Sequence, residues 1–198
     1  SAGFIGFHLS RRLLENGYKV IGYDSLTTYY DVQLKLSRNK ILNKFENFIN
    51  HVGDITDSEY LFEICSKYNP SFIVHLAAQA GVRYSIENPR NYVETNVLGT
   101  FNVMECARKF KVEHFLLAST SSIYGGNKEM PYSETQKADL QLTIYSATKK
   151  STESMAHAYS NLWSIPTTAF RFFTVYGPWG RPDMAFFKFA KKVCKQCS

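Results

Sequence analysis

Short segments rich in β-branched and aromatic residues alternate with longer amphipathic segments along this chain. The short segments lie at 18–24, 48–52, 71–78, 114–118 and 167–173. Strands that alternate with helices of about 10 to 15 residues form βαβ units around a parallel sheet. The sequence therefore predicts the α/β class, with a Rossmann-like doubly wound parallel sheet and no internal repeat.

For two segments, the sequence also predicts which side chains are buried. The run at 71–78 is continuously apolar, which is typical of a parallel strand covered on both faces. Its His75 is expected to be a hydrogen-bonded core residue, not a catalytic one. Apolar residues recur at helical spacing in the segment 92–110, at Val93, Val97, Phe101 and Met104. We expect this stripe to face the core.

Composition excludes several classes of protein. The 198 residues are enough for one domain or slightly more, and a hydrophobic content of 44% argues against disorder. The net charge is +6, but no basic stripe interleaved with aromatic residues indicates a nucleic-acid partner. Lysines gather near the end as a solvated helix face, at Lys188, Lys191, Lys192 and Lys195. No apolar run of about 18 residues indicates a membrane span, so a cytoplasmic protein is expected.

The cysteines and histidines show no pattern typical of a metal or a disulfide framework. Cys65 and Cys106 are isolated, and the pair Cys194 and Cys197 lacks the surroundings of a redox or zinc motif. Free thiols in a reducing compartment are the better interpretation. The five histidines have no metal-ligand spacing, and no metal is expected.

The first residues and the first strand suggest a nucleotide site. Gly3 and Gly6 open an amphipathic segment, where a glycine pair lets the backbone approach a pyrophosphate at a helix N-terminus. Close helix packing would explain the same spacing. Asp24 ends the next strand, 18 residues beyond Gly6, close to the spacing of a carboxylate that binds a ribose and repels a 2′-phosphate. Unless Asp24 is only a turn residue, NAD is favoured over NADP.

A second candidate site lies at Tyr145 and Lys149, which are four residues apart at the start of a helix expected to run through about Leu162. Side chains at this spacing share one helix face. A nearby cation favours the phenolate form of a tyrosine, so the pair could take a proton from a hydroxyl. The pair alone means little, because the same spacing occurs on many solvated helices.

Several motifs in this order resemble the extended short-chain dehydrogenase/reductase superfamily of NAD-dependent nucleotide-sugar epimerases and dehydratases. They are GlyxxGly at 3, Asp24, GlyAspIle at 53, HisLeuAlaAla at 75, AsnValxGlyThr at 96, SerIleTyrGly at 122 and TyrxxxLys at 145. Within the superfamily, the chain is most similar to the UDP-glucuronate 4-epimerase family. That similarity is carried by TyrTyrAspVal at 29, GlnAlaGlyValArg at 79 and ArgPhePheThrValTyrGlyProTrpGlyArgProAspMet at 171.

The chain departs from this family at both ends. The family has a strand before residue 1, which lies in the middle of the sheet, and a carboxyl-terminal substrate region; a fragment is therefore expected. The strand's absence would leave two hydrogen-bonding ladders unpaired. We expect an NAD-binding domain at 1–180 and the start of a substrate-binding region at 181–198.

The resemblance implies site residues for NAD and for a UDP-sugar. Tyr145 would act as the base on the sugar 4-hydroxyl, Lys149 would hold the nicotinamide ribose, and Thr120, Ser121 and Ser122 would bind the reacting oxygen. The implied cofactor-binding residues are Gly3, Phe4, Ile5, Gly6, Asp24, Asp54, Ile55, Leu76, Ala77, Ala78, Asn96, Tyr145, Lys149 and Phe172. The implied substrate-binding residues are Arg83, Ser121, Ser122, Thr174 and Arg181, where the two arginines are alternatively surface residues. A homodimer is implied for the complete protein.

Ser121 and Ser122 bear on the choice of reaction. Related 4,6-dehydratases have an Asp and a Glu at these positions, and UDP-glucuronate decarboxylases have a Glu at the second. Two neutral hydroxyls favour simple epimerisation and leave a reductase or a different sugar open. The resemblance implies epimerisation at C4, from UDP-glucuronate to UDP-galacturonate through a 4-keto sugar. The alternatives are an NAD-binding fragment or pseudoenzyme without turnover, and an epimerase or dehydratase for another nucleotide sugar.

Overall fold

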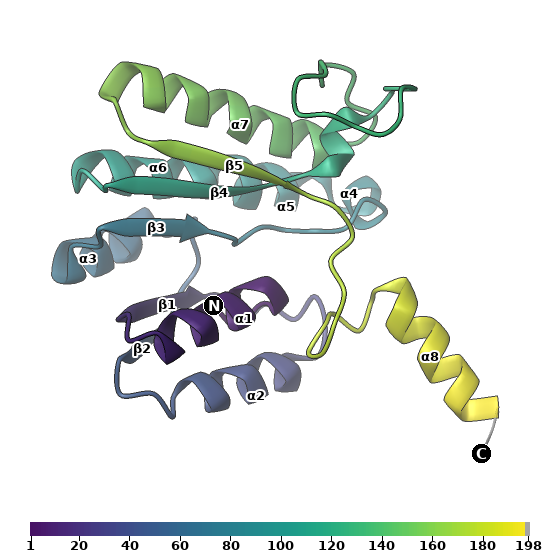
Figure 1. Ribbon diagram of the computed structural model, residues 1–198, viewed down its shortest axis with the longest axis horizontal. Helices are drawn as coiled ribbons and strands as arrows, with labels where there is room; N and C mark the ends of the chain where they lie inside the picture. The colour runs from purple at the N-terminus through teal and green to yellow at the C-terminus, as the bar shows by residue number, and fades with distance from the viewer. Residues whose placement is uncertain (197–198) are drawn as a thin grey trace. The chain divides into compact units, whose positions relative to one another are not determined.

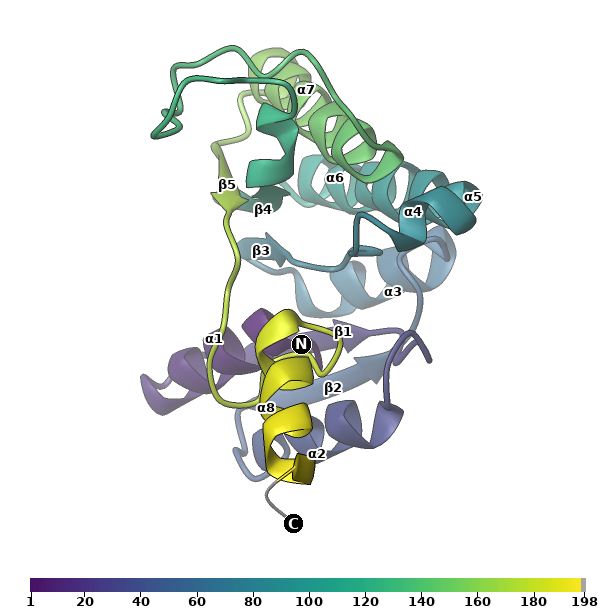
Figure 2. The ribbon, with the colours of Figure 1, turned by 90° about the vertical axis from the view of Figure 1, so that its right-hand side faces the viewer.

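The computed structural model describes residues 1–196 and divides into two compact units. The first unit contains residues 1–53 and the segment that starts at Thr174, and the second runs from Asp54 to Phe173. Figures 1 and 2 show the elements of each unit. The predicted functional boundary near residue 180 stays a prediction.

The first unit is built on two parallel strands, β1 (Val20–Asp24) and β2 (Phe48–Val52), with Val20 opposite Phe48. Its helices are α1 (Phe4–Glu15), α2 (Val32–Leu42) and α8 (Ala185–Gln196). The Asp31 carboxylate caps α2 by accepting a hydrogen bond from the Gln33 N–H at 2.9 Å. These bounds confirm the strands and helices expected in this part of the sequence.

An apolar cluster joins α1 and α2 to the strands of the first unit. The buried members come from α1, α2 and β2, and are Phe7, Leu14, Leu42 and Phe48. Val20, Ile41 and Phe45 pack around them. This core holds the start of α1 near the end of β1, where the glycines and Asp24 of the predicted nucleotide site are found.

The second unit contains a parallel sheet in the order β3 (Phe72–His75), β4 (His114–Thr120) and β5 (Thr167–Phe172). The α-helices are α3 (Ser58–Tyr68), α4 (Tyr84–Glu87), α5 (Pro89–Tyr92), α6 (Thr100–Lys109) and α7 (Ile144–Trp163). A π-helix η1 (Val93–Gly99) joins α5 to α6, and a 3-10 helix η2 (Ser121–Tyr124) follows β4. All the strands described here are parallel, which confirms the predicted α/β class.

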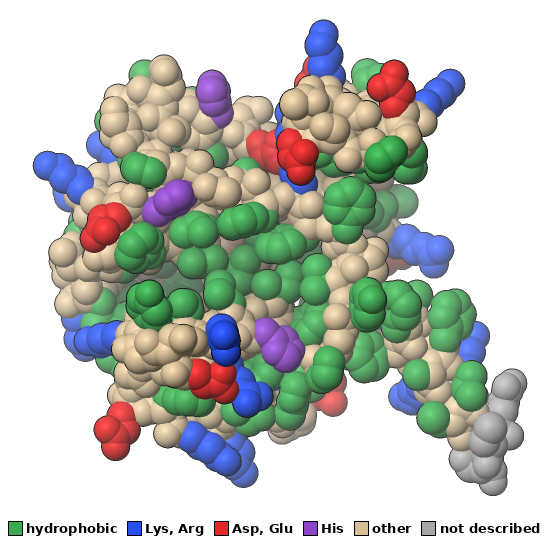
Figure 3. All heavy atoms as spheres, in the orientation of Figure 1, with side chains coloured by type: hydrophobic (Ala, Val, Ile, Leu, Met, Phe, Trp, Pro, Cys, Tyr) green, Lys and Arg blue, Asp and Glu red, His purple; other side chains and the backbone are tan. Residues whose placement is uncertain are grey.

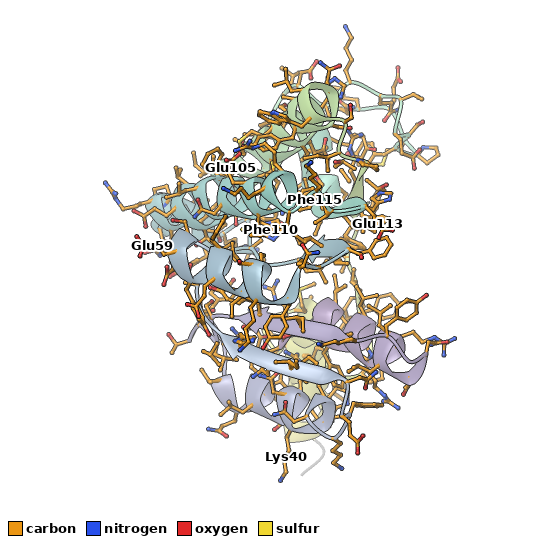
Figure 4. All side chains as sticks on the ribbon, turned by 90° about the vertical axis from the view of Figure 1, so that its left-hand side faces the viewer. Lys40, Glu59, Glu105, Phe110, Glu113 and Phe115 are labelled. Carbon is orange, nitrogen blue, oxygen red and sulfur yellow. The ribbon has the colours of Figure 1, made fainter. Side chains whose placement is uncertain are left out.

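One face of the second sheet carries the helices. Figure 2 shows α3, α6 and α7 on the same side of β3, β4 and β5. Phe110, directly after α6, packs its ring 5.0 Å from the ring of Phe62 on α3, on the side of the unit seen in Figure 4. On the other face, hydrophobic side chains are visible over β3 in Figure 3. Phe72 and Val74 are 56% and 37% exposed.

The expectation that 71–78 forms a strand covered on both faces is therefore wrong in two respects. The strand ends at His75, and its burial alternates along the strand instead of being continuous. The helices of this unit cover only the face that carries His75, which is 4% exposed. An apolar run alone does not distinguish one covered face from two.

The expected inner stripe of the segment 92–110 is also partly wrong. Met104 is buried, but Val93 and Phe101 are 51% and 41% exposed. The buried face is the adjacent stripe, which includes the polar residues Asn96 and Thr100. Both polar side chains make buried hydrogen bonds, to Gln79 and His75 respectively, and these bonds offset the cost of burying them.

Three cysteines lie within the described residues, and all three are free thiols, with Cys65 and Cys106 buried and Cys194 exposed. Cys197 and the side chain of Lys195 lie outside the described part of the structure. Over residues 1–196, none of the helices combines the length and the apolar character needed to cross a bilayer.

Candidate active site

In the second unit, the carboxyl end of β4 leads directly into a hydroxyl-rich turn. Thr120 is the last residue of β4, and its hydroxyl oxygen accepts a hydrogen bond from the Ser122 N–H at 3.2 Å. This bond caps η2, on which Ser121 and Ser122 are half-buried. It leaves the hydroxyl hydrogen of Thr120 available for donation to an oxygen of a ligand. Because η2 packs against α7, these residues lie next to the helix that carries Tyr145 and Lys149.

A reciprocal cap fixes the start of α7. The Thr143 hydroxyl accepts a hydrogen bond from the Ser146 N–H at 3.1 Å, and the Ser146 hydroxyl accepts one from the Thr143 N–H at 3.2 Å. This capping box satisfies backbone donors that have no partner within a helix. It places Tyr145 in the first turn of α7, where the ring is half-buried and packs edge-on against Tyr92 with centroids 6.0 Å apart.

Lys149 lies one turn further along α7 and is 2% exposed. Burial lowers the pKa of its ammonium group from 10.5 to about 8, although the nearby Glu153 carboxylate works in the opposite direction. The chain therefore keeps a buried cation that is only partly compensated. A group of this kind can hold an anionic or hydroxyl-bearing ligand and can favour the phenolate form of a tyrosine one turn away.

His75 lies on β3, where Lys149 acts on it electrostatically, and it is neutral. Its burial, together with the charge of Lys149, lowers its pKa to about 3. The Nε2 atom lies 2.8 Å from the Thr100 hydroxyl oxygen. This confirms the expected core histidine and leaves Lys149 as the charged member of the pair.

Asn96 connects three elements of the second unit. Its carboxamide oxygen accepts a hydrogen bond from the Gln79 N–H at 2.8 Å, and its amide group donates to the Gln79 carbonyl at 3.1 Å and to the Thr148 hydroxyl at 3.2 Å. Asn96 is fully buried within η1, and π-helical turns are frequently found at functional sites. Its amide hydrogens hold the loop after β3 to α7, so contact with a cofactor would be indirect or through the remaining lone pair of the oxygen.

The other cofactor-binding residues expected in this unit follow its strands or precede its first helix. Leu76, Ala77 and Ala78 form the half-buried loop after β3, and Phe172 is the last residue of β5. The Asp54 carboxylate accepts hydrogen bonds from the Thr56 N–H at 2.9 Å and from its hydroxyl at 2.7 Å. Ile55 is buried beneath Gly99, where an added Cβ atom would approach the Ile55 side chain to 2.6 Å.

The first unit brings the glycine segment and Asp24 together. The Asp24 carboxylate accepts hydrogen bonds from the Ala2 N–H at 3.0 Å and the Leu26 N–H at 2.9 Å, and its side chain is 17% exposed. Gly3 precedes α1 without a side-chain cap, and the first turn, which contains Phe4, Ile5 and Gly6, has no acidic residue. No atom lies within 4 Å of a Cβ atom added at Gly3. This open helix N-terminus fits a negatively charged group.

The residues expected to bind the substrate have different surroundings. Arg83 and Thr174 are exposed in the loops after β3 and β5. In contrast, Arg181 is paired with Asp183 through two hydrogen bonds, and its guanidinium lies 5.6 Å from the ring centroid of Tyr29. A substrate anion would have to share Arg181 with this carboxylate.

Sequence reasoning missed several polar residues next to the predicted site. In the first unit, Arg38 is fully buried and donates to the Ala2 carbonyl at 2.8 Å, while Lys35 donates to the Thr27 carbonyl at 2.9 Å. In the second unit, Glu153 and Arg171 form an ion pair beside Lys149. The position of Glu153, four residues after Lys149, was a visible signal. Nothing in the sequence indicated its partner on β5.

The fold and these residues together define a Rossmann-like enzyme scaffold with the TyrxxxLys helix of short-chain dehydrogenases/reductases. A family model described as GDP-mannose 4,6 dehydratase matches residues 1–197. The chain therefore belongs to this family of NAD-dependent nucleotide-sugar epimerases and dehydratases, which confirms the family predicted from the motifs.

Named relatives are similar over nearly the whole chain. A probable UDP-glucuronate 4-epimerase of Rhizobium meliloti is 51% identical over 98% of this chain and 57% of the relative. UDP-glucuronate 4-epimerase 4 of Arabidopsis thaliana is 44% identical over 98% of this chain and 45% of the relative. The crystal structure of UDP-glucuronic acid 4-epimerase from Bacillus cereus with UDP-glucuronic acid and NAD is 35% identical, with a TM-score of 0.90 over 98% of this chain and 61% of that chain. This chain thus spans roughly half to three fifths of the length of these relatives.

The burial of Lys149 leads to a prediction about stability. Its pKa falls from 10.5 in the unfolded chain to about 8 when folded. Because protonation is disfavoured in the folded state, the cost is complete below pH 8 and disappears as the pH rises to 10.5. At about 1.36 kcal/mol per unit, Lys149→Met should raise the free energy of unfolding by about 1 to 3 kcal/mol at pH 7.

Urea denaturation of the ligand-free protein at pH 7 and at pH 10.5 measures this effect. The gain should shrink toward zero at the higher pH. Lys150→Met is the control on the same helix. The Lys150 side chain is 28% exposed and its ion pair with Glu153 spans 4.0 Å, so its removal should change the free energy of unfolding by less than about 1 kcal/mol. A Lys149→Met variant that is less stable than the parent at pH 7 would show that the ammonium is well compensated.

Proposed function

We propose that the full-length protein catalyses NAD-dependent epimerisation at C4 of a UDP-sugar, with UDP-glucuronate and UDP-galacturonate as the pair of substrates. The observation that carries this proposal is the arrangement in the second unit, where the buried Lys149 and the half-buried Tyr145 lie on α7 beside the hydroxyls that follow β4. The named UDP-glucuronate 4-epimerases among the similar proteins support the choice of reaction and sugar.

The residues present fit NAD. In the first unit, the uncapped start of α1 after Gly3 suits a pyrophosphate, and Asp24 suits the hydroxyls of an adenosine ribose. In the second unit, Lys149 would hold the nicotinamide ribose, and Leu76, Ala77 and Ala78 would line the cofactor's path after β3. When bound, NAD supplies a group that accepts a hydride from C4 and later returns it.

The chain's own residues would manage the proton and the position of the sugar. Tyr145 would take the proton of the sugar 4-hydroxyl, because the ammonium of Lys149 favours its phenolate form. The hydroxyl of Thr120, with those of Ser121 and Ser122, would donate hydrogen bonds to the reacting oxygen and fix its orientation. When the 4-keto sugar is reduced on its other face, Tyr145 would return the proton to the 4-oxygen, which would complete epimerisation with no net redox change.

The same hydroxyls favour epimerisation over loss of water. Dehydration across C5 and C6 requires an additional acid and base near those carbons, and Ser121 and Ser122 supply neither an Asp nor a Glu. We therefore place this protein with the epimerases of its family. A homodimer and a cytoplasmic location, both expected from the sequence, are part of the same proposal.

The role of Tyr145 is tested by Tyr145→Phe in the full-length protein. Removing one general acid/base should lower kcat by about 10² or more, while NAD stays bound because the remaining cofactor-binding residues are unchanged. Turnover is followed by separating the two UDP-sugars, and bound NAD is measured after denaturation of the purified protein. A kcat within twofold of the parent would remove Tyr145 from the chemistry, even with the family assignment unchanged.

The sugar is tested by comparing kcat/KM for UDP-glucuronate and UDP-glucose. A charge-assisted hydrogen bond to the C6 carboxylate contributes about 1.5 to 3 kcal/mol, so the preference for UDP-glucuronate should be roughly 10- to 150-fold. If Arg181 makes this contact, Arg181→Ala should abolish the preference, and Arg83→Ala should leave it intact. Equal losses for both sugars would place Arg181 on the diphosphate. An unmutated enzyme that prefers UDP-glucose would contradict the uronic-acid proposal.

A further inference from the structure

A bidentate ion pair joins β5 to α7 within the second unit. The Arg171 guanidinium donates from Nε to one Glu153 oxygen at 3.1 Å and from a terminal nitrogen to the other at 3.0 Å. The side chains of Arg171 and Glu153 are only 20% and 11% exposed. Both oxygens of the carboxylate are therefore engaged by one cation, in the geometry that matches a planar guanidinium best.

Glu153 is also the nearest acidic side chain to Lys149 along α7. Residues four apart on a helix are neighbours on its surface, and the charge of Glu153 acts on Lys149. Two other titratable groups near Lys149 are Tyr145 on the preceding turn of α7 and His75 on β3, on which the charge of Lys149 acts. His75 is neutral, so Glu153 is the carboxylate best placed to serve as a counter-ion for Lys149.

The same arginine reaches the turn that carries the site hydroxyls. A terminal nitrogen of Arg171 donates to the Tyr124 hydroxyl at 3.0 Å, and the guanidinium lies 5.0 Å from the centroid of the Tyr124 ring. Tyr124 is 2% exposed and is the last residue of η2, which begins at Ser121. Arg171 thereby connects β5, α7 and η2 at one point. Its remaining bond, to the Glu134 carbonyl, is longer, at 3.4 Å.

We propose that Arg171 is a positioning residue for the reaction. By pairing with the Glu153 carboxylate, it prevents Glu153 from forming an ion pair with Lys149 and keeps the Lys149 ammonium available to the cofactor and to Tyr145. The consequence for catalysis rests on the proposed function, but the electrostatic relation does not. The arrangement differs from a simple structural ion pair because removing one of its partners should change a third group, Lys149, that takes no part in the pair.

The physical reason is the competition between two cations for one carboxylate. While Glu153 is paired with Arg171, their opposite charges largely cancel, so that the pair exerts only a weak electrostatic effect on Lys149. Without the guanidinium, the full negative charge of Glu153 would act on Lys149, and a nearby opposite charge shifts a pKa by about 1 to 3 units. Lys150 would compensate in part, because its Nζ lies 4.0 Å from the same carboxylate.

The test is a titration of Lys149 in the full-length protein, using lysine labelled with ¹³C at Cε and NMR, with Lys149→Arg to assign the signal. In the parent, Lys149 should titrate near a pKa of about 8, because burial lowers its pKa. Arg171→Met should raise that pKa by about one unit, a tenfold gain in proton affinity. The double variant Arg171→Met with Glu153→Gln should return the pKa to the parent value or below, because the unpaired carboxylate is gone. If Arg171→Met does not fold, Arg171→Gln removes the charge but keeps a donor, and carries the same expectation.

A second bidentate Arg–Glu ion pair in the same unit provides a matched control. Arg108 donates to both oxygens of Glu105 on α6, at 3.0 and 2.7 Å, and neither residue acts on Lys149. Arg108→Met should leave the titration of Lys149 unchanged. In an active enzyme, the alkaline limb of the pH profile of kcat/KM should shift to higher pH in Arg171→Met. In the double variant it should return to the pH of the parent.

Two results would overturn the proposal. One is an unchanged Lys149 pKa in folded Arg171→Met or Arg171→Gln. The other is a double variant whose Lys149 titrates like that of Arg171→Met, because Arg171 would then act only by holding β5, α7 and η2 together. The titration is readable in any folded protein, so absence of epimerase activity would contradict the proposed function without affecting this outcome.

Discussion

The burial of one ammonium group, that of Lys149, is the constraint on which the rest of the candidate site depends. A charge removed from water loses hydration, and the fold recovers only part of that loss, which is why the pKa falls to about 8. The surrounding residues are arranged so that this cation is neither solvated nor fully paired. His75 is held neutral against Thr100, and Glu153 is held by Arg171. Such a cation retains interaction energy that a bound ribose and a tyrosine phenolate can use.

The scaffold around Lys149 fixes its position from several directions. The capping box of Thr143 and Ser146 fixes where α7 begins, and hence the turn on which each later side chain lies. Asn96 ties the residue before Lys149 to the loop after β3. Ser146 and Asn96 are buried, Thr143 is half-buried, and all three are hydrogen-bonded, so a shift of one element would leave donors or acceptors unpaired. The geometry of the site is therefore a property of the packed second unit and does not depend on a single loop.

The sequence predicted the positions of helices and strands better than it predicted which of their faces are buried. Strand and helix identities followed from periodicity, and Tyr145 and Lys149 were placed on one helix because their spacing is local. The stripe through Val93 and Phe101 was assigned to the core because apolar residues are usually buried. The buried face instead carries Asn96 and Thr100, because their side chains form hydrogen bonds with partners that are distant in the sequence. The exposed face of β3 could not be read from an apolar run, since burial depends on which helices cover the sheet. Likewise, the pairing of Glu153 with Arg171 joins residues 18 positions apart, and only the packing of β5 against α7 brings them together.

In the proposed reaction, a hydride leaves C4 of the sugar and returns to the same carbon without exchange with water. The direct measurement is to incubate the full-length protein with UDP-glucuronate that carries deuterium at C4, and to locate the isotope in both UDP-sugars at equilibrium by NMR. We expect deuterium to remain at C4 of the substrate and of its epimer, with none released to solvent. Loss of the label to water during epimerisation would contradict the proposed reaction, because the hydrogen would then move as a proton and the pairing of Tyr145 and Lys149 with a nicotinamide cofactor would not explain the reaction.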